Sequence, residues 1–334
     1  MNLELKAYEG SPSTLCVGCG HDSISKHIIS ACFHSKVLPF QLAKMSGIGC
    51  SSKIPAYFMS SSFAFNSMHG RMAPVATGAM IAQKDLLYLG VSGDGDTGNI
   101  GLGGFLHMIR RNAPIVYLIA NNGVFGLTKG QFSAAADKGS LAKSGRSAEL
   151  PSLDFCTLAL EAGCGFVARS FSGDGKQLVP LLQAAMKHRG TAVIDIISPC
   201  VTFNNHDGST KSYSYMKEHD QVLQELGFFT AAEEMLADYE EGGRQKVELP
   251  DGSHLLLKKL DSRAHDVHNR TQALSLLAQT RAQEEILTGL FYVNEATPRL
   301  AEQMQLTERS LSSLQEVDLR PTPEQLASLQ KDFR

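Results

Sequence analysis

The chain has 334 residues, 43% of them hydrophobic and 19% charged, and its 31 basic and 34 acidic side chains give a formal net charge of -3. This composition is typical of a globular protein and excludes a disordered or fibrous chain. The near-neutral charge disfavours a nucleic-acid-binding protein, which usually carries a basic excess. No apolar run approaches the ~18 residues of a membrane span, and residues 1–9 lack the order of a secretory signal. We therefore expect a cytoplasmic protein whose seven cysteines are thiols or metal ligands.

The predicted elements of the first two thirds of the chain alternate between strands and helices. Strands are expected at 85–91, 115–120, 165–170 and 191–198, and helices at 100–111, 156–161 and 176–188. Apolar strands that alternate with helices predict the α/β class, with a mostly parallel sheet covered by helices on both faces. In such sheets ligands bind at the carboxyl ends of the strands.

The last third of the chain differs in composition. Residues 1–230 hold 26 of the 30 glycines, whereas residues 231–334 hold four and carry 12 basic and 18 acidic side chains. Glycine allows the backbone to approach a ligand closely, so we predict a cofactor-binding domain over 1–230. We predict that residues 231–334 form a carboxy-terminal extension that serves as an interface or as a cover over the site. Its predicted elements are helices at 230–239 and 269–287, a hairpin from 246–249 and 255–259, and a last helix that opens at Thr322-Pro323.

Two polar clusters follow neighbouring predicted strands. Gly93-Asp94-Gly95-Asp96 ends one strand, and Asn121-Asn122 ends the next. Mg²⁺ prefers oxygen ligands and phosphate oxygens, so Asp94, Asn122 and the carbonyl of Val124 are its candidate ligands. A G-D-G-D sequence alone is equally consistent with a solvent-facing turn. Together the two clusters resemble the thiamine-diphosphate signature, in which the Asp and the second Asn hold magnesium.

Four cysteines lie in loops that contain Gly or Pro. Cys16 and Cys19 form a C-x-x-C pair, Cys50 lies in a glycine-rich loop, and Cys200 follows Pro199 after a predicted strand. Four thiolates suit tetrahedral zinc or an iron–sulfur cluster, and the spacing leaves both open. The other three cysteines occur in apolar contexts and are interpreted as small buried hydrophobic residues: Cys32, Cys156 and Cys164.

Several motifs occur in the order found in one family. They are L-C-V-G-C-G-H from Leu15, G-I-G-C-S-S-K from Gly47, His69-Gly70-Arg71, G-D-G-D from Gly93 and N-N-G-V-F-G-L-T-K-G-Q from Asn121. Over about residues 12–215 the chain resembles the beta subunits of 2-oxoacid:ferredoxin oxidoreductases, and most closely the 2-oxoglutarate enzymes.

This resemblance implies a set of cofactor ligands. One [4Fe-4S] cluster would be held by Cys16, Cys19, Cys50 and Cys200. Magnesium would be held by Asp94, Asn122 and Val124. Thiamine diphosphate would be bound by Ile48, Gly49, Cys50, Ser51, His69, Gly93, Gly95, Asp96, Leu127 and Thr128.

The resemblance also assigns a substrate end and a reaction. Lys53 and Arg71 are the candidate catalytic cations, because a cationic group can pair with a 2-oxoacid carboxylate; Arg71 is equally consistent with an interface role. His21 and His107 are interpreted as structural. The family reaction is a coenzyme A-dependent oxidative decarboxylation, reversible in principle, that passes electrons through the cluster to ferredoxin.

A partner subunit is expected from the same resemblance. Thiamine enzymes need a glutamate against the cofactor, and no glutamate lies between Glu9 and Glu149. In the family an alpha subunit supplies it, together with contacts to substrate and coenzyme A, which predicts a dimer of alpha–beta heterodimers.

Other functions fit parts of the sequence. A pyruvate or broad-range 2-oxoacid oxidoreductase is the first alternative, although the G-I-G-C-S-S and His69-Gly70-Arg71 motifs resemble the 2-oxoglutarate enzymes more than the pyruvate enzymes. A non-redox thiamine decarboxylase would use the cysteines structurally, and a zinc-held binding module would have no catalysis. Iron, zinc and thiamine analysis separates these classes.

Overall fold

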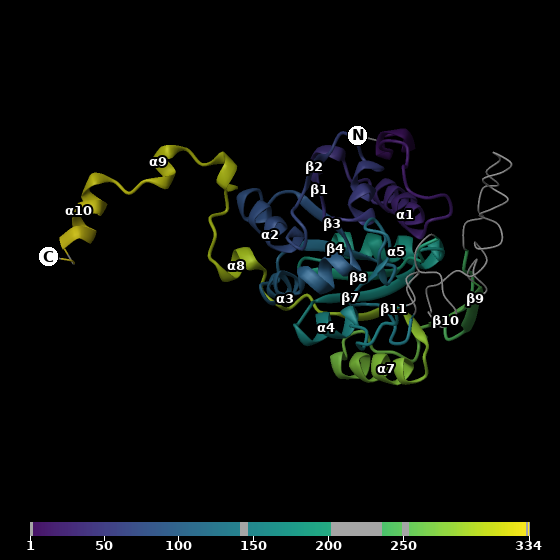
Figure 1. Ribbon diagram of the computed structural model, residues 1–334. Helices are drawn as coiled ribbons and strands as arrows, with labels where there is room; N and C mark the ends of the chain where they lie inside the picture. The colour runs from purple at the N-terminus through teal and green to yellow at the C-terminus, as the bar shows by residue number, and fades with distance from the viewer. Residues whose placement is uncertain (1–2, 141–145, 202–235, 249–253, 332, 334) are drawn as a thin grey trace.

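A computed structural model describes residues 3–140, 146–201, 236–248, 254–331 and 333. Its centre is a nine-stranded sheet in the order β2-β1-β3-β4-β8-β7-β11-β10-β9 (Figure 1). The strands are β1 (Leu42–Ser46), β2 (Phe63–Asn66), β3 (Leu87–Gly93), β4 (Ile115–Asn121), β7 (Phe166–Phe171), β8 (Ala192–Ile197), β9 (Arg244–Glu248), β10 (His254–Lys259) and β11 (Ile286–Val293). A separate short hairpin joins β5 (Val124–Phe125) to β6 (Gln131–Phe132).

Most strand pairs are parallel, which confirms the predicted fold class. The six strands from β2 to β7 pair in parallel throughout. Next to them β11 pairs with β7 in the antiparallel sense and with β10 in the parallel sense, and β9 completes an antiparallel pair with β10. Residues 244–293 therefore continue the sheet that residues 42–197 begin.

Helices cover both faces of the sheet. One face packs against α1 (Gly20–His34) and α5 (Gly175–Lys187), and the other packs against α2 (Met72–Ala82), α3 (Leu102–Arg110), α4 (Phe155–Glu161) and α7 (Arg270–Ala282). Short turns complete the fold: 3-10 turns at Leu5–Tyr8, Pro39–Gln41, Cys50–Ala56 and Leu311–Ser313, and a π-helical turn at Asp96–Ile100.

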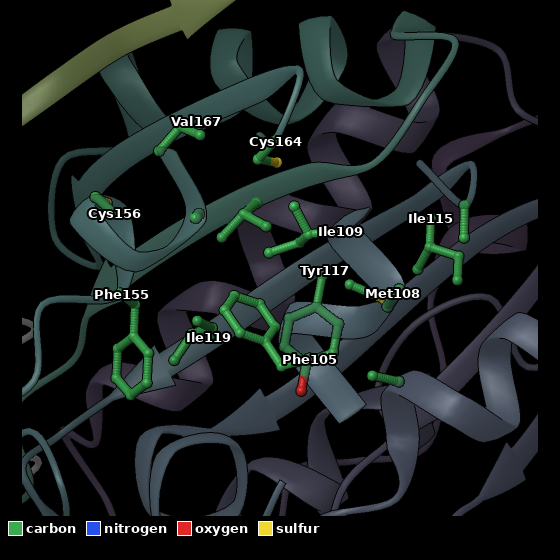
Figure 2. Close-up of a cluster of buried hydrophobic side chains, with 14 of the residues drawn as sticks. Phe105, Met108, Ile109, Ile115, Tyr117, Ile119, Phe155, Cys156, Cys164 and Val167 are labelled. Atoms are coloured by element: carbon green, nitrogen blue, oxygen red, sulfur yellow. The ribbon is translucent and has the colours of Figure 1, made fainter. Parts of the chain in front are cut away.

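Each face of the sheet carries its own hydrophobic core, and the side chains of strand β4 alternate between the two. Tyr117 and Ile119 point into the core under α3 and α4, where Phe105 and Phe155 also lie (Figure 2). The intervening Leu118 belongs to the opposite core, under α1 and α5. Successive side chains of a strand point to opposite faces, so a strand buried on both faces is apolar throughout. This is why the run at 115–120 was recognisable as a central strand.

Every strand and helix predicted between residues 85 and 198 is confirmed within two residues. The hairpin at 246–249 and 255–259 is confirmed in its strand pairing; its turn lies outside the described residues. The last helix is confirmed as α10 (Pro323–Lys331), with the hydroxyl of Thr322 accepting from the N–H of Gln325 at 3.2 Å.

Two predicted helices of the extension differ from the structure. The helix expected over 269–287 ends at Ala282, because Glu284 takes a left-handed backbone (φ 57°) and the next residues form β11. The run of β11 contains Ile, Leu, Phe, Tyr and Val, which fit a buried strand. Of the helix expected over 230–239, residues 230–235 lie outside the described residues, and 236–239 are not helical.

The chain leaves the body of the molecule after α8 (Leu300–Gln303). Lys84 donates to the carbonyl of Thr307 at 2.9 Å, and the hydroxyl of Ser310 donates to Asp85 at 2.6 Å. Beyond these contacts α9 (Glu316–Leu319) and α10 extend away from the sheet (Figure 1). In the described parts of the chain, no helix has the length and apolar character needed to cross a membrane.

A buried ion pair network fastens β7 to β8 and to α4. Arg169 and Asp195 are direct neighbours in the two parallel strands, and their side chains meet at 2.8 Å. Arg169 also binds Asp154 at 2.7 Å, and Asp154 accepts from the N–H of Thr157 at the start of α4. Burial alone raises the pKa of Asp154, but the Arg169 charge and these hydrogen bonds outweigh it and hold the pKa below its ordinary value.

Replacing Asp154 by asparagine is expected to lower the free energy of unfolding by about 2 kcal/mol at pH 7, since the helix cap is kept and the ion pair is lost. A carboxyl with a lowered pKa stabilises the folded state above its unfolded pKa, and this stability is lost as pH falls through the folded pKa. The difference between Asp154→Asn and the parent should therefore shrink below pH 3.8. Urea unfolding followed by circular dichroism checks this; an equal difference at all pH values would contradict it.

Candidate active site

A cavity at the carboxyl ends of β3 and β4 brings together segments that are distant in the sequence. All ten residues predicted to bind thiamine diphosphate line it: Ile48, Gly49, Cys50, Ser51, His69, Gly93, Gly95, Asp96, Leu127 and Thr128. The three predicted magnesium ligands, Asp94, Asn122 and Val124, line it as well. The expectation that ligand-binding residues gather at this edge of a parallel sheet therefore holds.

Asp94 lies at the centre of the predicted magnesium site and is 1% exposed. Its carboxylate accepts hydrogen bonds from the N–H of Gly123 at 2.9 Å and from the hydroxyl of Ser133. The side-chain oxygen of Asn122 accepts from the N–H of Val124 at 3.1 Å. The turn after β4 is thus wrapped around the carboxylate, and Gly123 permits it by taking a positive φ of 73°.

Asp96 orients the loop that carries His69. One oxygen of its buried carboxylate accepts from the N–H of Gly70 at 2.7 Å and from the ring of His69, and the other accepts from the hydroxyl of Ser92 at 2.6 Å. Ser92 is in turn bound by Thr97 at 2.9 Å. This network fixes the end of β3 relative to the loop at 69–70. Asp96 thus has two roles: it lines the cavity, and it holds two segments of the lining in place.

The donor groups around the cavity suit a diphosphate and its metal ion. The hydroxyl of Ser51 is buried and has no hydrogen-bond partner among the described residues, which leaves it available to a ligand oxygen. A side chain at Gly93 would meet that hydroxyl at 3.2 Å, so glycine keeps the approach to Ser51 open. Oxygen ligands at Asp94 and Asn122 match the preference of Mg²⁺. The residues present therefore fit thiamine diphosphate with magnesium.

The four predicted cluster ligands lie near one another beside this cavity. Cys19 and Cys200 are buried, Cys50 is half-buried and Cys16 is exposed. Burial raises the pKa of the Cys19 thiol to about 12; the main-chain N–H of His21 opposes this shift, and the neighbouring cysteines add to it. Burial, Cys200 and Cys16 likewise raise the pKa of Cys50, against the Lys53 charge. The pKa values of Cys19 and Cys50 therefore both depend on the neighbouring cysteines.

A preformed metal-binding group is not present in the part of the chain that the structure describes: no three or more His, Cys, Asp or Glu side chains are arranged to hold an ion. The cluster ligands and magnesium ligands therefore stay predictions. The remaining cysteines are confirmed as buried residues. The thiol of Cys164, for example, reaches the carbonyl oxygens of Phe166 and Thr191, both at 3.3 Å.

The two predicted catalytic cations lie outside the cavity lining. The ammonium of Lys53 donates to the carbonyl of Thr14 at 3.2 Å, next to the amino-terminal cysteine loop. Arg71 is exposed, with its guanidinium 3.5 Å from the carbonyl of Gly70. Each lies two residues after a residue of the lining, Lys53 after Ser51 and Arg71 after His69, but its side chain contacts a carbonyl outside the lining.

His21 is a cavity residue that the sequence interpretation treated as structural. It is 2% exposed, lines the cavity and lies 2.6 Å from the hydroxyl of Ser198 through its Nδ1. Burial lowers its pKa to about 4, so the ring is neutral. Its place directly after the C-x-x-C-G motif was the available signal. His107, by contrast, is exposed on α3 and lies 3.4 Å from Arg110.

Adding a methyl group at Gly95 is expected to weaken thiamine diphosphate binding by about tenfold. A Cβ at this position would lie 2.5 Å from the ring of Phe125, which lines the same cavity. Isothermal titration calorimetry of the full chain with Mg²⁺ and thiamine diphosphate measures the effect of Gly95→Ala. A second substitution, Phe125→Leu, should restore affinity by removing the clash, and Phe125→Leu alone is the control. Unchanged affinity in Gly95→Ala would contradict the packing argument.

Known proteins resemble this chain over the whole site. Residues 47–196 match the thiamine pyrophosphate enzyme C-terminal TPP binding domain. The chain is 38% identical over 199 residues to the 2-oxoacid:ferredoxin oxidoreductase subunit beta of a Sulfolobus species, a match that covers 59% of this chain and 65% of that protein. It is 38% identical over 213 residues to the 2-oxoglutarate oxidoreductase subunit KorB of Mycobacterium tuberculosis, covering 63% and 55%. These matches thus span less than two thirds of each relative.

Two further comparisons cover nearly all of the similar protein. The chain is 31% identical over 264 residues to the 2-oxoglutarate synthase subunit KorB of Methanocaldococcus jannaschii, covering 75% of this chain and 95% of that one. A 2-oxoglutarate:ferredoxin oxidoreductase chain from Magnetococcus marinus, solved with 2-oxoglutarate, coenzyme A and succinyl-CoA bound, matches with a TM-score of 0.76 and 26% identity over 98% of this chain and 96% of that chain. The family expected from the motifs is confirmed, and the chain belongs to the 2-oxoacid:ferredoxin oxidoreductase beta subunits.

Proposed function

We propose that this chain is the thiamine-diphosphate-binding subunit of an enzyme that converts a 2-oxoacid and coenzyme A to an acyl-CoA and CO₂ and passes the electrons to ferredoxin. The observation that carries the proposal is the single cavity lined by residues from five separate motifs. Cys50 belongs both to this lining and to the group of interacting thiols. A reaction that releases electrons at one cofactor and stores them on another needs the two close together, and Cys50 would place them so.

We propose 2-oxoglutarate as the substrate. KorB relatives carry 2-oxoglutarate in their names, and the similar solved structure contains 2-oxoglutarate and coenzyme A. Pyruvate and a broader range of 2-oxoacids are the outcomes to be tested against it. Lys53 and Arg71 are the proposed partners of the substrate carboxylate, which requires their side chains to turn from their present carbonyl contacts toward the cavity.

Residues of this chain would hold three cofactors in the proposal. Asp94, Asn122 and the carbonyl of Val124 would bind magnesium, and Cys16, Cys19, Cys50 and Cys200 would bind one [4Fe-4S] cluster. When bound, thiamine diphosphate supplies an electron sink as CO₂ leaves, and the cluster takes the electrons onward. The protein's part is to bind the diphosphate through Ser51 and, through the magnesium ion, Asp94, and to exclude water with the apolar part of the lining.

The proposal includes a partner alpha subunit. The cavity lining contains no glutamate among the described residues, and thiamine enzymes need one against the cofactor ring. The alpha subunit would supply it, together with contacts to coenzyme A and substrate, in a dimer of alpha–beta heterodimers. We assign cofactor binding to residues 1–230 and a supporting or interface role to 231–334, whose last helices extend from the body.

An anaerobic assay of the complex of this chain with its alpha subunit tests the proposal. The expected result is coenzyme A-dependent reduction of a dye acceptor or ferredoxin by 2-oxoglutarate, at a higher kcat/KM than by pyruvate. The same preparation should contain iron, acid-labile sulfide and thiamine diphosphate. Decarboxylation without iron or without acceptor reduction would favour the non-redox enzyme. A preparation that contains zinc and no thiamine diphosphate would favour the non-catalytic zinc-binding module.

A further inference from the structure

We propose that His21 is a cofactor-binding residue: its ring, fixed by Ser198, contacts bound thiamine diphosphate. The inference rests on the proposed function and adds a residue to it. Three observations meet at this one residue. His21 lines the cavity, its Nδ1 lies 2.6 Å from the hydroxyl of Ser198, and the residue is only 2% exposed.

Ser198 connects His21 to two other parts of the site. Its own N–H donates to the carbonyl of Asn121 at 2.7 Å, and Asn121 directly precedes the predicted magnesium ligand Asn122. Two residues further along the chain is Cys200, a predicted cluster ligand. The bond between His21 and Ser198 therefore joins the amino-terminal cysteine loop to the ends of both β4 and β8, although 177 residues separate the two partners.

The packing around this bond leaves little freedom for the ring. A side chain at Gly20 would meet the hydroxyls of Ser172 and Ser198 at 2.6 and 2.7 Å, so the start of α1 lies directly against the end of β8. His21 is buried and uncharged there, which makes it a hydrogen-bonding group of fixed direction rather than a charge. With Nδ1 engaged by Ser198, the remaining ring nitrogen is the one free to face a ligand.

The test uses the complex with its alpha subunit and the variants His21→Asn, His21→Gln and Ser198→Ala. Asparagine places an amide near Nδ1 and keeps the bond to Ser198, whereas glutamine reaches the far ring nitrogen. The exposed His107→Asn is the matched control. Titration calorimetry measures the Kd of Mg²⁺–thiamine diphosphate for depleted complex, and iron analysis verifies that each variant keeps the metal content of the parent.

We expect His21→Asn to weaken cofactor binding about tenfold with its iron content retained, and His21→Gln to recover most of that loss. Ser198→Ala should also weaken binding, because it frees the ring of His21, and His107→Asn should leave the Kd unchanged. Parent-like Kd in both His21→Asn and Ser198→Ala overturns the inference, as does equal loss in the asparagine and glutamine variants. A parent complex without iron or without cofactor affinity refutes the proposed function instead, which keeps the two failures distinct.

Discussion

Replacing Asp94 by alanine is expected to weaken the binding of Mg²⁺ and thiamine diphosphate by about a thousandfold, which corresponds to about 4 kcal/mol. Asp94 is the only carboxylate among the proposed magnesium ligands, and its charge offsets that of the ion. The carboxylate also holds the turn after β4 through the N–H of Gly123 at 2.9 Å. Its removal therefore takes away one ligand and releases the turn that presents Asn122 and the Val124 carbonyl.

Titration calorimetry of the depleted complex measures this effect, with circular dichroism to verify that the variant is folded. The matched control is Asp238→Asn, because Asp238 is 70% exposed and its ion pair with Lys176 lies at the surface. Surface pairs of this kind contribute little, so the control should bind as the parent does. Should Asp94→Ala keep its affinity within threefold, the magnesium assignment is wrong even if the cavity itself binds the cofactor.

Replacing Cys50 by serine is expected to remove most of the iron and acid-labile sulfide from anaerobically prepared complex and to abolish acceptor reduction. Cys50 is unique among the four candidate ligands because it also lines the cofactor cavity. Serine keeps the size of the side chain but is a poor ligand for iron in these clusters, which are held by thiolates. The broad absorption near about 400 nm should disappear with the iron, while thiamine diphosphate still binds.

The control for this variant is Cys32→Ala, which removes a thiol that is fully buried in α1. That thiol contacts Met186 at 3.9 Å and lies in the apolar core. The control should retain iron and activity and lose about 1 kcal/mol of stability for its small cavity. If Cys50→Ser retained full iron and Cys32→Ala lost it, the ligand set would have to be reassigned.

The predictions that succeeded rest on local patterns. The apolar run of β4 is long enough to be read as a buried strand, and the polar residues that end β3 and β4 mark where the chain turns. Parallel strands bring their carboxyl ends to one edge, so Asp94 and Asn122 could be placed together before their contacts were known. The cofactor cavity was therefore largely accessible from motif order and strand direction.

The predictions that failed depend on contacts between distant residues. The helix expected over 269–287 stops early because Ile286–Val293 finds a partner in β7, and no local pattern identifies that neighbour. Strand β2 went unrecognised for the same reason: it is exposed along its whole length and is held by pairing with β1 alone. The place of His21 in the cavity was not predicted either, because its partner Ser198 lies 177 residues away.

The sequence by itself determined the fold class, the edge of the sheet that carries chemistry and the residue types gathered there, because periodicity and turn chemistry act over a few residues. The tertiary structure alone decided which residues after 231 continue the sheet, where Lys53 and Arg71 direct their side chains, and how His21 faces the cavity. These features depend on contacts between residues that are far apart in the sequence. No short segment contains both partners of such a contact, so local patterns do not predict it.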